Sequence, residues 1–346
     1  MIALPGMYRH FLKRAGWYAA TFIVAVSLVF LLPRLGPVSY TDILKANMTF
    51  GPMTAEQREE LISAYMKEHD LDKPLWIQFR SYALRILKGD LGKSLNFNAK
   101  PCAAMIGEKI PWTLGLIIPA VALAWIIGNL LGALAAFRRG IFDKGIYRTS
   151  VFIGSVPFFC FGLLLMYLFY SLFPVVDSLG GYSPDIIDKG WNSRFLPSVL
   201  SHYWVPFLSI FLVLIGGQAA GMRSTTIYEL ESDSMKYAET LGIRRSKVFF
   251  YCLRNALLPQ LSGLAITIGT MVGGSLITEI IFAYPGLGTL LFDSIKSRDY
   301  PLIQAVSLVV TVATLCLCFA VEIISAFVDP RIKASFENDG GAYASN

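Results

Sequence analysis

The sequence predicts an all-α membrane protein with six transmembrane helices. Of its 346 residues, 55% are hydrophobic and 16% are charged, and the mean hydropathy is +0.55. Soluble chains average about 45–50% apolar and about 25% charged residues, so this chain is too apolar for that class. The apolar residues also gather into six runs, most of which reach the roughly 20 residues that a helix needs to cross a bilayer.

The six runs give the predicted spans 17–32, 112–137, 146–173, 203–222, 257–283 and 302–328. The first is short, and Arg14 and Arg34 at its two ends are expected to extend toward the membrane surfaces. The basic segment before it is typical of a secretory signal, but no small-residue cleavage pattern follows, so we expect an uncleaved span. In the second span, Gly128 and Gly132 have a spacing that allows close packing, either within the bundle or in a dimer. Pro157 predicts a kink in the third span, because proline removes a backbone hydrogen bond.

The distribution of basic residues predicts the orientation of the spans. The short segments 1–16, 138–145, 223–256 and 329–346 carry many Lys and Arg residues. The short links 174–202 and 284–301 carry few, namely Lys189, Arg194, Lys296 and Arg298. The polar segment 33–111 exceeds the roughly 60 residues over which the positive-inside rule holds, so its lysines are not counted. Both termini are therefore expected in the cytoplasm. The basic residues that give the net charge of +6 follow this pattern. They form no continuous patch of the kind that binds nucleic acid.

The segment 33–111 is expected to form a large extracytoplasmic region with two helices. Thr54 and Gln57 have the spacing of a capping box at the start of the first helix. Pro74 is expected at the first position of the second helix, which carries one apolar stripe. The stripe consists of Leu75, Phe79, Tyr82 and Ile86. The letters GDLGKS in this segment are similar to a phosphate-binding loop. Leu87 stands where that loop needs its first glycine, so the chain itself is not expected to bind ATP.

Catalysis within the membrane is the competing class of function. A serine protease needs a histidine base, but His10, His69 and His202 all lie away from the middle of a predicted span. An aspartyl protease needs paired aspartates, and the predicted spans contain none. Glu279 and Glu322 are the only acidic residues in the apolar runs. Each lies near a span end, so neither is expected to relay protons. For Glu322 a pairing with a nearby basic group is the favoured interpretation. The five cysteines show no disulfide or metal-binding spacing, and the sequence predicts a chain that is not an enzyme.

The polar stretch 232–259 stands between two long apolar runs and predicts a cytoplasmic docking element. Within 228–241, apolar or small residues recur at helical spacing, namely Leu230, Ser234, Tyr237, Ala238 and Leu241. Glu229, Glu231 and Asp233 fall in the expected first turn, where the helix dipole favours anions. Gly242 stands where a C-terminal cap is expected. The prediction is a short helix with a small, approachable Ala238 near its end, followed by a basic run.

The letters KYAETLG in this stretch resemble the second half of the Glu-Ala-Ala-x-x-x-Gly loop in membrane subunits of ATP-binding cassette (ABC) importers. Ala238 falls on the last alanine and Gly242 on the glycine, whereas Lys236 and Tyr237 depart from the first two positions. The segments LRNALLPQ, DLDKPLWIQF and KGDLGKSL resemble the oligopeptide and dipeptide permease branch. The resemblance covers nearly the whole chain and implies a coupling helix that fits a groove of the ATPase subunit. The expected docking residues are Lys236, Tyr237, Ala238, Glu239, Leu241 and Gly242.

A second match to the same branch is the segment 278–304, TEIIFAYPGLGTLLFDSIKSRDYPLIQ. The resemblance implies an outer loop that bends toward the mouth of the pathway, where Pro285 presets a turn and Gly286 is free to take positive φ. Glu279 is expected to face the pathway or a subunit contact and not lipid. The expected outer-gate residues are Glu279, Tyr284, Pro285, Gly286 and Gly288. An ordinary turn between spans is the alternative. The segment DPRIK at 329–333 also fits the branch, but its usual asparagine and aspartate in the last span are here Cys318 and Glu322.

These observations predict a permease subunit that forms half of the pathway of an importer in a bacterial inner membrane. The resemblance implies a second permease subunit, either a similar chain or a second copy, two ATPase subunits that bind ATP and Mg²⁺, and an extracytoplasmic substrate-binding protein. The substrate is an oligopeptide or an oligosaccharide, and the Tyr-Ala-Glu form of the loop is more similar to the sugar-carrying members. Nickel is disfavoured, because no His or Cys cluster lies along the spans. A channel or structural membrane subunit without an ATPase is the alternative class.

Overall fold

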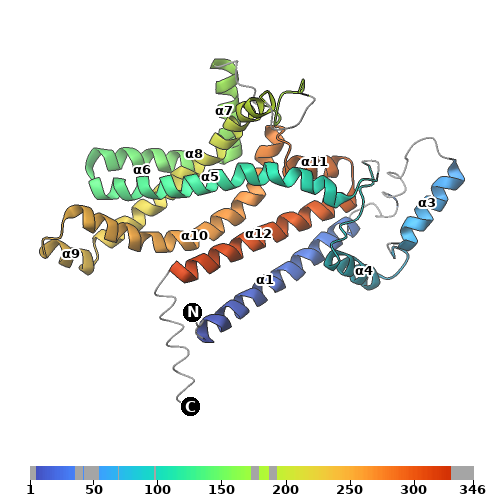
Figure 1. Cartoon of the computed structure of the whole chain (residues 1–346), viewed down its shortest axis with the longest axis horizontal. Coiled ribbons are helices and arrows are strands. Elements are labelled where there is room, and N and C mark those ends of the chain that lie inside the picture. The colour runs from blue at the N-terminus through green and yellow to red at the C-terminus, as the bar shows by residue number, and fades with distance from the viewer. Residues whose placement is uncertain are drawn as a thin grey trace, which may run out of the picture. The chain divides into compact units, whose positions relative to one another are not determined.

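The computed structural model describes residues 5–35, 42, 54–68, 70–96, 99–172, 179–186 and 193–328. Apart from one isolated bridge, the regular structure in these ranges is helical (Figure 1). The helices are α1 (Pro5–Leu31), the 3₁₀ helix η1 (Leu32–Arg34), α3 (Ala55–Glu68), α4 (Leu75–Leu87), α5 (Cys102–Arg138), α6 (Gly140–Gly154), α7 (Phe158–Leu172), α8 (Phe195–Leu230), α9 (Asp233–Thr240), α10 (Arg245–Ile281), α11 (Leu287–Lys296) and α12 (Tyr300–Val328). Five helices of the described chain are long and apolar enough to cross a membrane, and the bent pair α6 and α7 supplies a sixth span if counted as one. The all-α class is confirmed, while the limits of the spans in the membrane stay predictions.

The chain is divided into two compact units. The first unit comprises Met1–Arg14, Leu114–Tyr284 and Cys316–Asn346, and the second comprises Ala15–Thr113 and Pro285–Leu315. The long helices α1, α5 and α12 each contribute to both units. The predicted docking helix belongs to the first unit, whereas α3, α4 and α11 belong to the second.

Helix α8 is the centre of the first unit, and α6, α7 and α10 pack against it. Glycines make this close packing possible. A Cβ on Gly132 of α5 would lie 2.3 Å from the carbonyl oxygen of Ala219, and a Cβ on Gly216 of α8 would lie 2.6 Å from that of Ser150. No larger residue fits at either place without moving a helix backbone. Gly128 and Gly132 both face α8, so their GxxxG spacing serves packing within the chain's own bundle.

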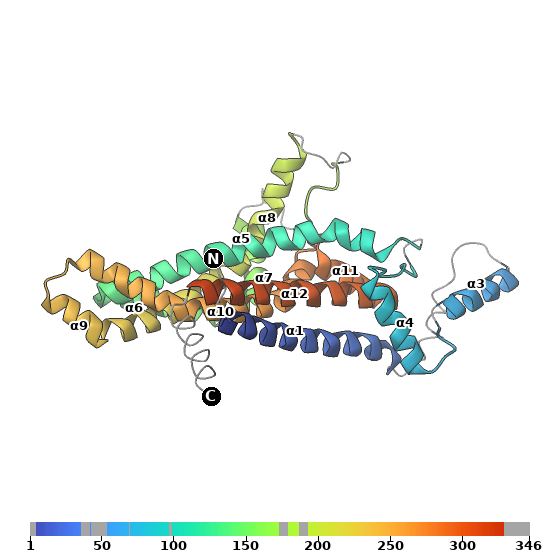
Figure 2. The ribbon, with the colours of Figure 1, turned by 60° about the horizontal axis from the view of Figure 1, so that its bottom comes forward.

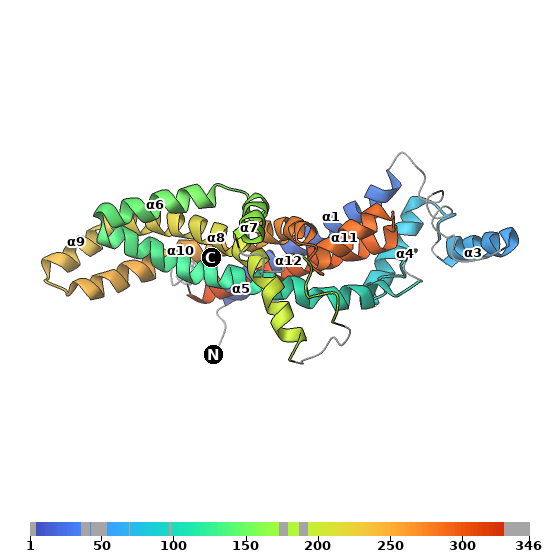
Figure 3. The same ribbon diagram turned by 90° about the horizontal axis from the view of Figure 1, so that it is seen from above.

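The predicted third span is broken at Pro157. Helix α6 ends at Gly154, α7 begins at Phe158, and their axes differ by 99°. Figure 3 shows α7 turned away from α6. Proline lacks the N–H that would continue the helix. The Phe158 ring lies so close to Gly274 of α10 that a Cβ there would be 2.1 Å from it. The expected kink is therefore a complete break, and Gly274 makes room for the start of α7.

The two predicted extracytoplasmic helices are present in the second unit. Helix α3 begins with the predicted capping box, in which the backbone N–H of Thr54 donates to Gln57 Oε1 at 3.2 Å and that of Gln57 donates to Thr54 Oγ1 at 3.3 Å. Helix α4 begins at Leu75, so Pro74 is the residue before the helix and not its first position. Leu75 is 54% exposed and lies outside the packed part of the predicted stripe.

Helix α4 packs against the end of α1 in the second unit (Figure 2). Phe30 is almost fully buried, and its ring centre lies 5.3 Å from that of Phe79 and 5.4 Å from that of Tyr82. Arg34 lies over the Phe30 ring at 3.7 Å and donates to Gln78 Oε1 at 3.1 Å. Instead of only extending toward the membrane surface, Arg34 joins the end of the first span to α4.

The link between α3 and α4 is held by Asp70. Lys73 Nζ lies 2.7 Å from its Oδ1, and Ser81 Oγ donates to its Oδ2 at 2.5 Å. These two contacts, with Lys73 the larger, hold the pKa of Asp70 below its ordinary value. The folded state favours the carboxylate, so this contribution to stability is complete above the ordinary aspartate pKa and is lost as the pH falls through the lowered one.

Asp299 joins the loop after α4 to the start of α12 within the second unit. Its carboxylate is fully buried, and Oδ2 accepts from the Ser94 hydroxyl and from the backbone N–H groups of Leu95 at 3.0 Å and Asn96 at 3.3 Å. Oδ1 accepts from the backbone N–H of Leu302 at 3.3 Å and so caps α12. Ser94 and Leu95, at the end of the segment KGDLGKSL whose letters are similar to a phosphate-binding loop, thus bind a carboxylate of their own chain.

We expect Asp299→Ala to destabilise the second unit. The change leaves buried donors without their acceptor, at a cost of about 1–3 kcal/mol for each such group, and it removes a helix cap worth about 1 kcal/mol. The melting temperature of the purified complex should fall. Asp293→Ala, which removes an exposed aspartate of α11, is the matched control and should leave the melting temperature unchanged. Equal melting of both variants and the wild type would contradict this role of Asp299.

Candidate functional site

Helix α9 is a short, sharply terminated helix at one end of the first unit, between α8 and α10 (Figure 2). Gly242 follows it with a φ of +71°. The backbone N–H of Gly242 donates to the carbonyl of Glu239 at 3.0 Å, and that of Ile243 donates to the carbonyl of Ala238 at 3.2 Å. This pair of bonds is a Schellman motif, which requires the left-handed backbone that glycine adopts at no steric cost. The predicted C-terminal cap at Gly242 is present.

The inner face of α9 is packed against the chain's own helices. Met235 and Ala238 are 6% and 7% exposed, and they form a cluster with Val248 and Cys252 of α10. Partly buried residues complete the cluster, namely Phe137, Leu230 and Ile243. Side chains from α5, α8 and α10 therefore fix the position of α9.

The outer face of α9 is apolar in part and exposed. Tyr237 is 66% and Leu241 is 60% exposed. Lys236 and Glu239 flank them and are also exposed, with Lys236 Nζ 3.8 Å from Asp233 Oδ1. An exposed tyrosine and leucine on one short helix, surrounded by polar side chains, form a surface suited to burial against a partner protein.

Basic residues surround the end of α9. Arg244, Arg245 and Lys247 are exposed, and Arg245 lies 5.2 Å from the centre of the Phe137 ring. The side-chain Nδ2 of Asn255 on α10 donates to Oε2 of Glu229 on α8 at 3.3 Å. Glu229 thus lies at the end of α8 and links it to α10.

An ion pair that the sequence analysis did not predict holds α6 to α8. Arg223 Nε lies 2.5 Å from Asp143 Oδ1, and Nη2 donates to Oδ2 at 2.7 Å. The guanidinium also lies 4.3 Å from the centre of the Tyr147 ring. The only available signal was one aspartate in an otherwise basic loop, RRGIFDKGIYR. A bidentate pair of this kind fixes geometry as well as distance, and it stiffens the segment that leads into α9.

The docking region differs from the sequence prediction in two respects. Helix α8 continues to Leu230, and α9 is a separate helix that begins at Asp233, so Glu229 and Glu231 do not lie in its first turn. Ala238 is not approachable, because its methyl group is buried against α10. Of the expected docking residues, Lys236, Tyr237, Glu239 and Leu241 face outward, while Gly242 shapes the helix end.

The expected outer-gate residues occupy the end of α10 and the start of α11. Glu279 is fully buried in the first unit. Its side chain is packed within the chain. It therefore does not face lipid, as expected, but it also does not lie on an exposed pathway surface. Its carbonyl accepts from the backbone N–H of Tyr284 at 2.8 Å, and Ala283 between them has a φ of +49°. This helix end is again a Schellman motif, with alanine in the position that usually takes glycine.

Pro285 and Gly286 lie in a bend as predicted, but the positive φ expected at Gly286 was wrong. Gly286 has a φ of −94° and is the residue before α11, so it requires no positive φ. The left-handed residue is Ala283. After it the chain forms helix α11, with Leu287, Gly288 and Leu290 buried, where a turn was expected. The backbone N–H of Leu287 donates to Thr113 Oγ1 at 2.8 Å within the second unit.

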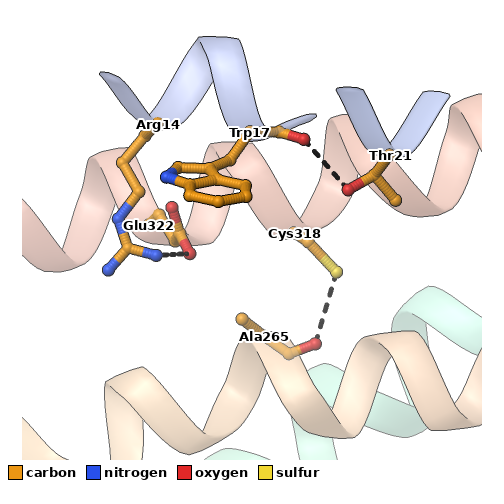
Figure 4. Close-up of polar contacts among 6 residues, drawn as sticks. All are labelled: Arg14, Trp17, Thr21, Ala265, Cys318 and Glu322. Carbon is orange, nitrogen blue, oxygen red and sulfur yellow. Dashed lines mark hydrogen bonds and ion pairs between the residues drawn. The ribbon is translucent and has the colours of Figure 1, made fainter. Parts of the chain in front are cut away.

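The two unusual polar residues of the last span have partners in the first unit (Figure 4). Arg14 Nη1 lies 3.1 Å from Glu322 Oε1, which confirms the predicted pairing of Glu322 with a basic group. Cys318 Sγ donates to the carbonyl oxygen of Ala265 at 3.4 Å. These contacts give both side chains a packing role between α12 and its neighbours. In the described part of the chain, no cluster of His, Cys, Asp or Glu is arranged to hold a metal ion.

The first unit is a helical bundle in which the short helix α9 connects two long candidate spans, α8 and α10. Residues 128–334 match the family of binding-protein-dependent transport system inner membrane components. The chain belongs to this family and is a permease of the peptide branch of ABC importers. It is thus a multi-pass inner-membrane component of a complex with other subunits.

Curated relatives are similar over nearly the whole chain. The di/tripeptide transport system permease protein DppB of Pseudomonas aeruginosa is 30% identical over 337 residues, covering 93% of this chain and 97% of the relative. The glutathione transport system permease protein GsiC of Salmonella typhi is 30% identical over 329 residues, covering 94% and 99%. The dipeptide transport system permease protein DppB of Lactococcus lactis is 29% identical over 332 residues, covering 94% and 100%.

We expect the left-handed backbone conformation of Gly242 to determine the position of α9. A Cβ at Gly242 would meet nothing within 4 Å, so a substitution acts through the left-handed backbone alone. Asparagine tolerates this conformation and valine does not. Gly242→Val should therefore displace α9 and reduce recovery of the ATPase with the purified permease, whereas Gly242→Asn should retain it. If the two variants retain the ATPase equally, the Schellman motif does not position the docking helix.

Proposed function

We propose that this chain forms half of the translocation pathway of an ATP-driven importer of short peptides. The observation that carries the proposal is helix α9, which is fixed to α5, α8 and α10 on one face and presents Tyr237 and Leu241 on the other. A helix so built passes the movement of a docked protein to the predicted spans. That protein would be an ATPase subunit, which would bind ATP and Mg²⁺.

The composition of the complex follows from the number of docking helices in one chain. One α9 supplies one docking site, and the ATPases of ABC transporters work as pairs, so a second permease subunit completes the complex. A similar but different chain is favoured over a second copy by the resemblance to the peptide branch. A separate extracytoplasmic protein would deliver the substrate. The charge distribution supports a cytoplasmic position of α9 and of both termini.

Peptides are favoured as the substrate because the relatives described above are named for dipeptides, di/tripeptides and glutathione. The Tyr-Ala-Glu form of the loop, which favoured an oligosaccharide, carries less weight than similarity over the whole chain. The segment from Glu279 to Gly288 is proposed as the outer gate, with Ala283 in place of Gly286 as the residue of positive φ.

The double variant Tyr237→Ala and Leu241→Ala should weaken ATPase association while leaving membrane insertion intact. Both side chains are exposed, so the fold loses little, whereas anchors buried at an interface commonly contribute more than about 1 kcal/mol each, and tenfold or more weaker association is expected. The measurement is recovery of the ATPase with the purified permease, together with peptide uptake into proteoliposomes that contain the complete complex.

The matched control is Trp76→Ala with Leu87→Ala. These residues of α4 are similarly exposed, at 67% and 78%, and lie in the predicted extracytoplasmic region. ATPase recovery should be unchanged by this pair. An equal loss for both pairs, or none for either, would refute α9 as the docking site. Absence of any ATPase from a wild-type complex that conducts solutes would favour the channel alternative.

A further inference from the structure

A cavity of about 470 Å³ lies in the first unit where the third predicted span is broken. It is bounded by the break between α6 and α7, by α8 and by α10. The polar side chains of the lining are Ser155, Gln218, Thr267 and Thr270. All of them belong to segments that the sequence predicts to cross the membrane, namely 146–173, 203–222 and 257–283.

The backbone at the break departs from a continuous helix between Gly154 and Phe158. The N–H groups of Ser155 and Val156 still donate to the carbonyls of Val151 and Ile153, whereas Pro157 has no N–H to donate. Irregular backbone at membrane depth is tolerated only where protein covers it or where it lines a water-filled cavity. In transporters, such interrupted spans commonly mark the place where the substrate binds. The four polar side chains beside the break fit an aqueous path better than a lipid-facing surface.

Most of the cavity lining is apolar, and its four polar side chains are uncharged. Gln218 Nε2 donates to Thr267 Oγ1 at 3.3 Å, which joins α8 to α10 across the cavity wall. Ser155 and Thr270 are exposed, and each hydroxyl donates to a carbonyl of its own helix, at 2.6 Å to Val151 and at 2.9 Å to Thr267. Their oxygen lone pairs remain open to a ligand. None of the lining residues is ionisable at neutral pH.

We propose that this cavity binds the uncharged backbone of the passing substrate and ignores the charge of its side chains. Hydroxyl and carboxamide groups donate to and accept from peptide amides, and a lining without ionisable groups neither attracts nor repels a charged side chain by direct pairing. The pathway at this point would therefore accept acidic, neutral and basic short peptides alike. This inference rests on the proposed importer function and adds the substrate chemistry of one segment.

The first test asks whether the cavity is aqueous. In a complex whose five native cysteines have been replaced and which still imports peptide, Thr270→Cys should react with a water-soluble methanethiosulfonate. Substrate delivered by the binding protein should slow the reaction. Ile126→Cys, at an exposed apolar position of α5 (56%), should stay unreactive. If Thr270→Cys is as unreactive as Ile126→Cys with and without nucleotide while import continues, this inference fails and the proposed function stands. If the wild-type complex imports no peptide, the proposed function fails first.

The second test asks whether the absence of charged side chains from the cavity allows both acidic and basic peptides to pass. Modification of Thr270→Cys after assembly with an anionic or a cationic reagent places either charge in the cavity without a folding step. The anionic form should reduce import of an acidic tripeptide relative to a basic one by about tenfold, and the cationic form should reverse the preference, because like charges in contact repel strongly. Modified Ser262→Cys, on an exposed part of α10 outside the lining, is the control. An unchanged preference overturns the proposal, and so does import of a neutral oligosaccharide in preference to every peptide.

Discussion

The proposed docking function depends on a small apolar cluster that fixes α9. Met235 and Ala238 pack on Val248 and Cys252, and the Schellman motif at Gly242 directs the chain back so that α10 begins beside α9. Without this cluster, an eight-residue helix would be marginal in water. Because α8 and α10 pack against each other and against α6 and α7, the force applied at α9 reaches most of the first unit. The small size of Ala238 is explained by this inward packing.

Close packing around α8 places a second constraint on the first unit. The glycine contacts of α5 and α6 with α8 bring helix backbones together, where van der Waals contact replaces the hydrophobic driving force that is absent in lipid. Gly216 faces Gly154 at the end of α6, next to the break at Pro157. The same contacts therefore hold the break in place. The cavity is lined in part by the same break.

The sequence predicted those features that depend on local patterns. The capping box at Thr54 and Gln57, the cap at Gly242 and the break near Pro157 all follow from residue chemistry over a few positions. Features that depend on distant residues were missed, such as the Arg223–Asp143 pair and the carboxylate of Asp299. Positive φ was expected at Gly286 because glycine favours it, whereas the Schellman motif at the end of α10 places that conformation at Ala283. The orientation of Ala238 was likewise set by α10, which no pattern within 228–241 reveals.

The central claim is that α9 moves as one body with α10 when the ATPases close. Electron paramagnetic resonance between spin labels at Thr240→Cys on α9 and Tyr251→Cys on α10, both exposed positions, tests it in the complete complex with the native cysteines replaced. The account predicts the same distance distribution in the nucleotide-free and the ATP-trapped states, because the cluster of Met235, Ala238 and Val248 stays intact. A shift or broadening of that distribution on ATP binding would show that α9 moves independently and would contradict the account.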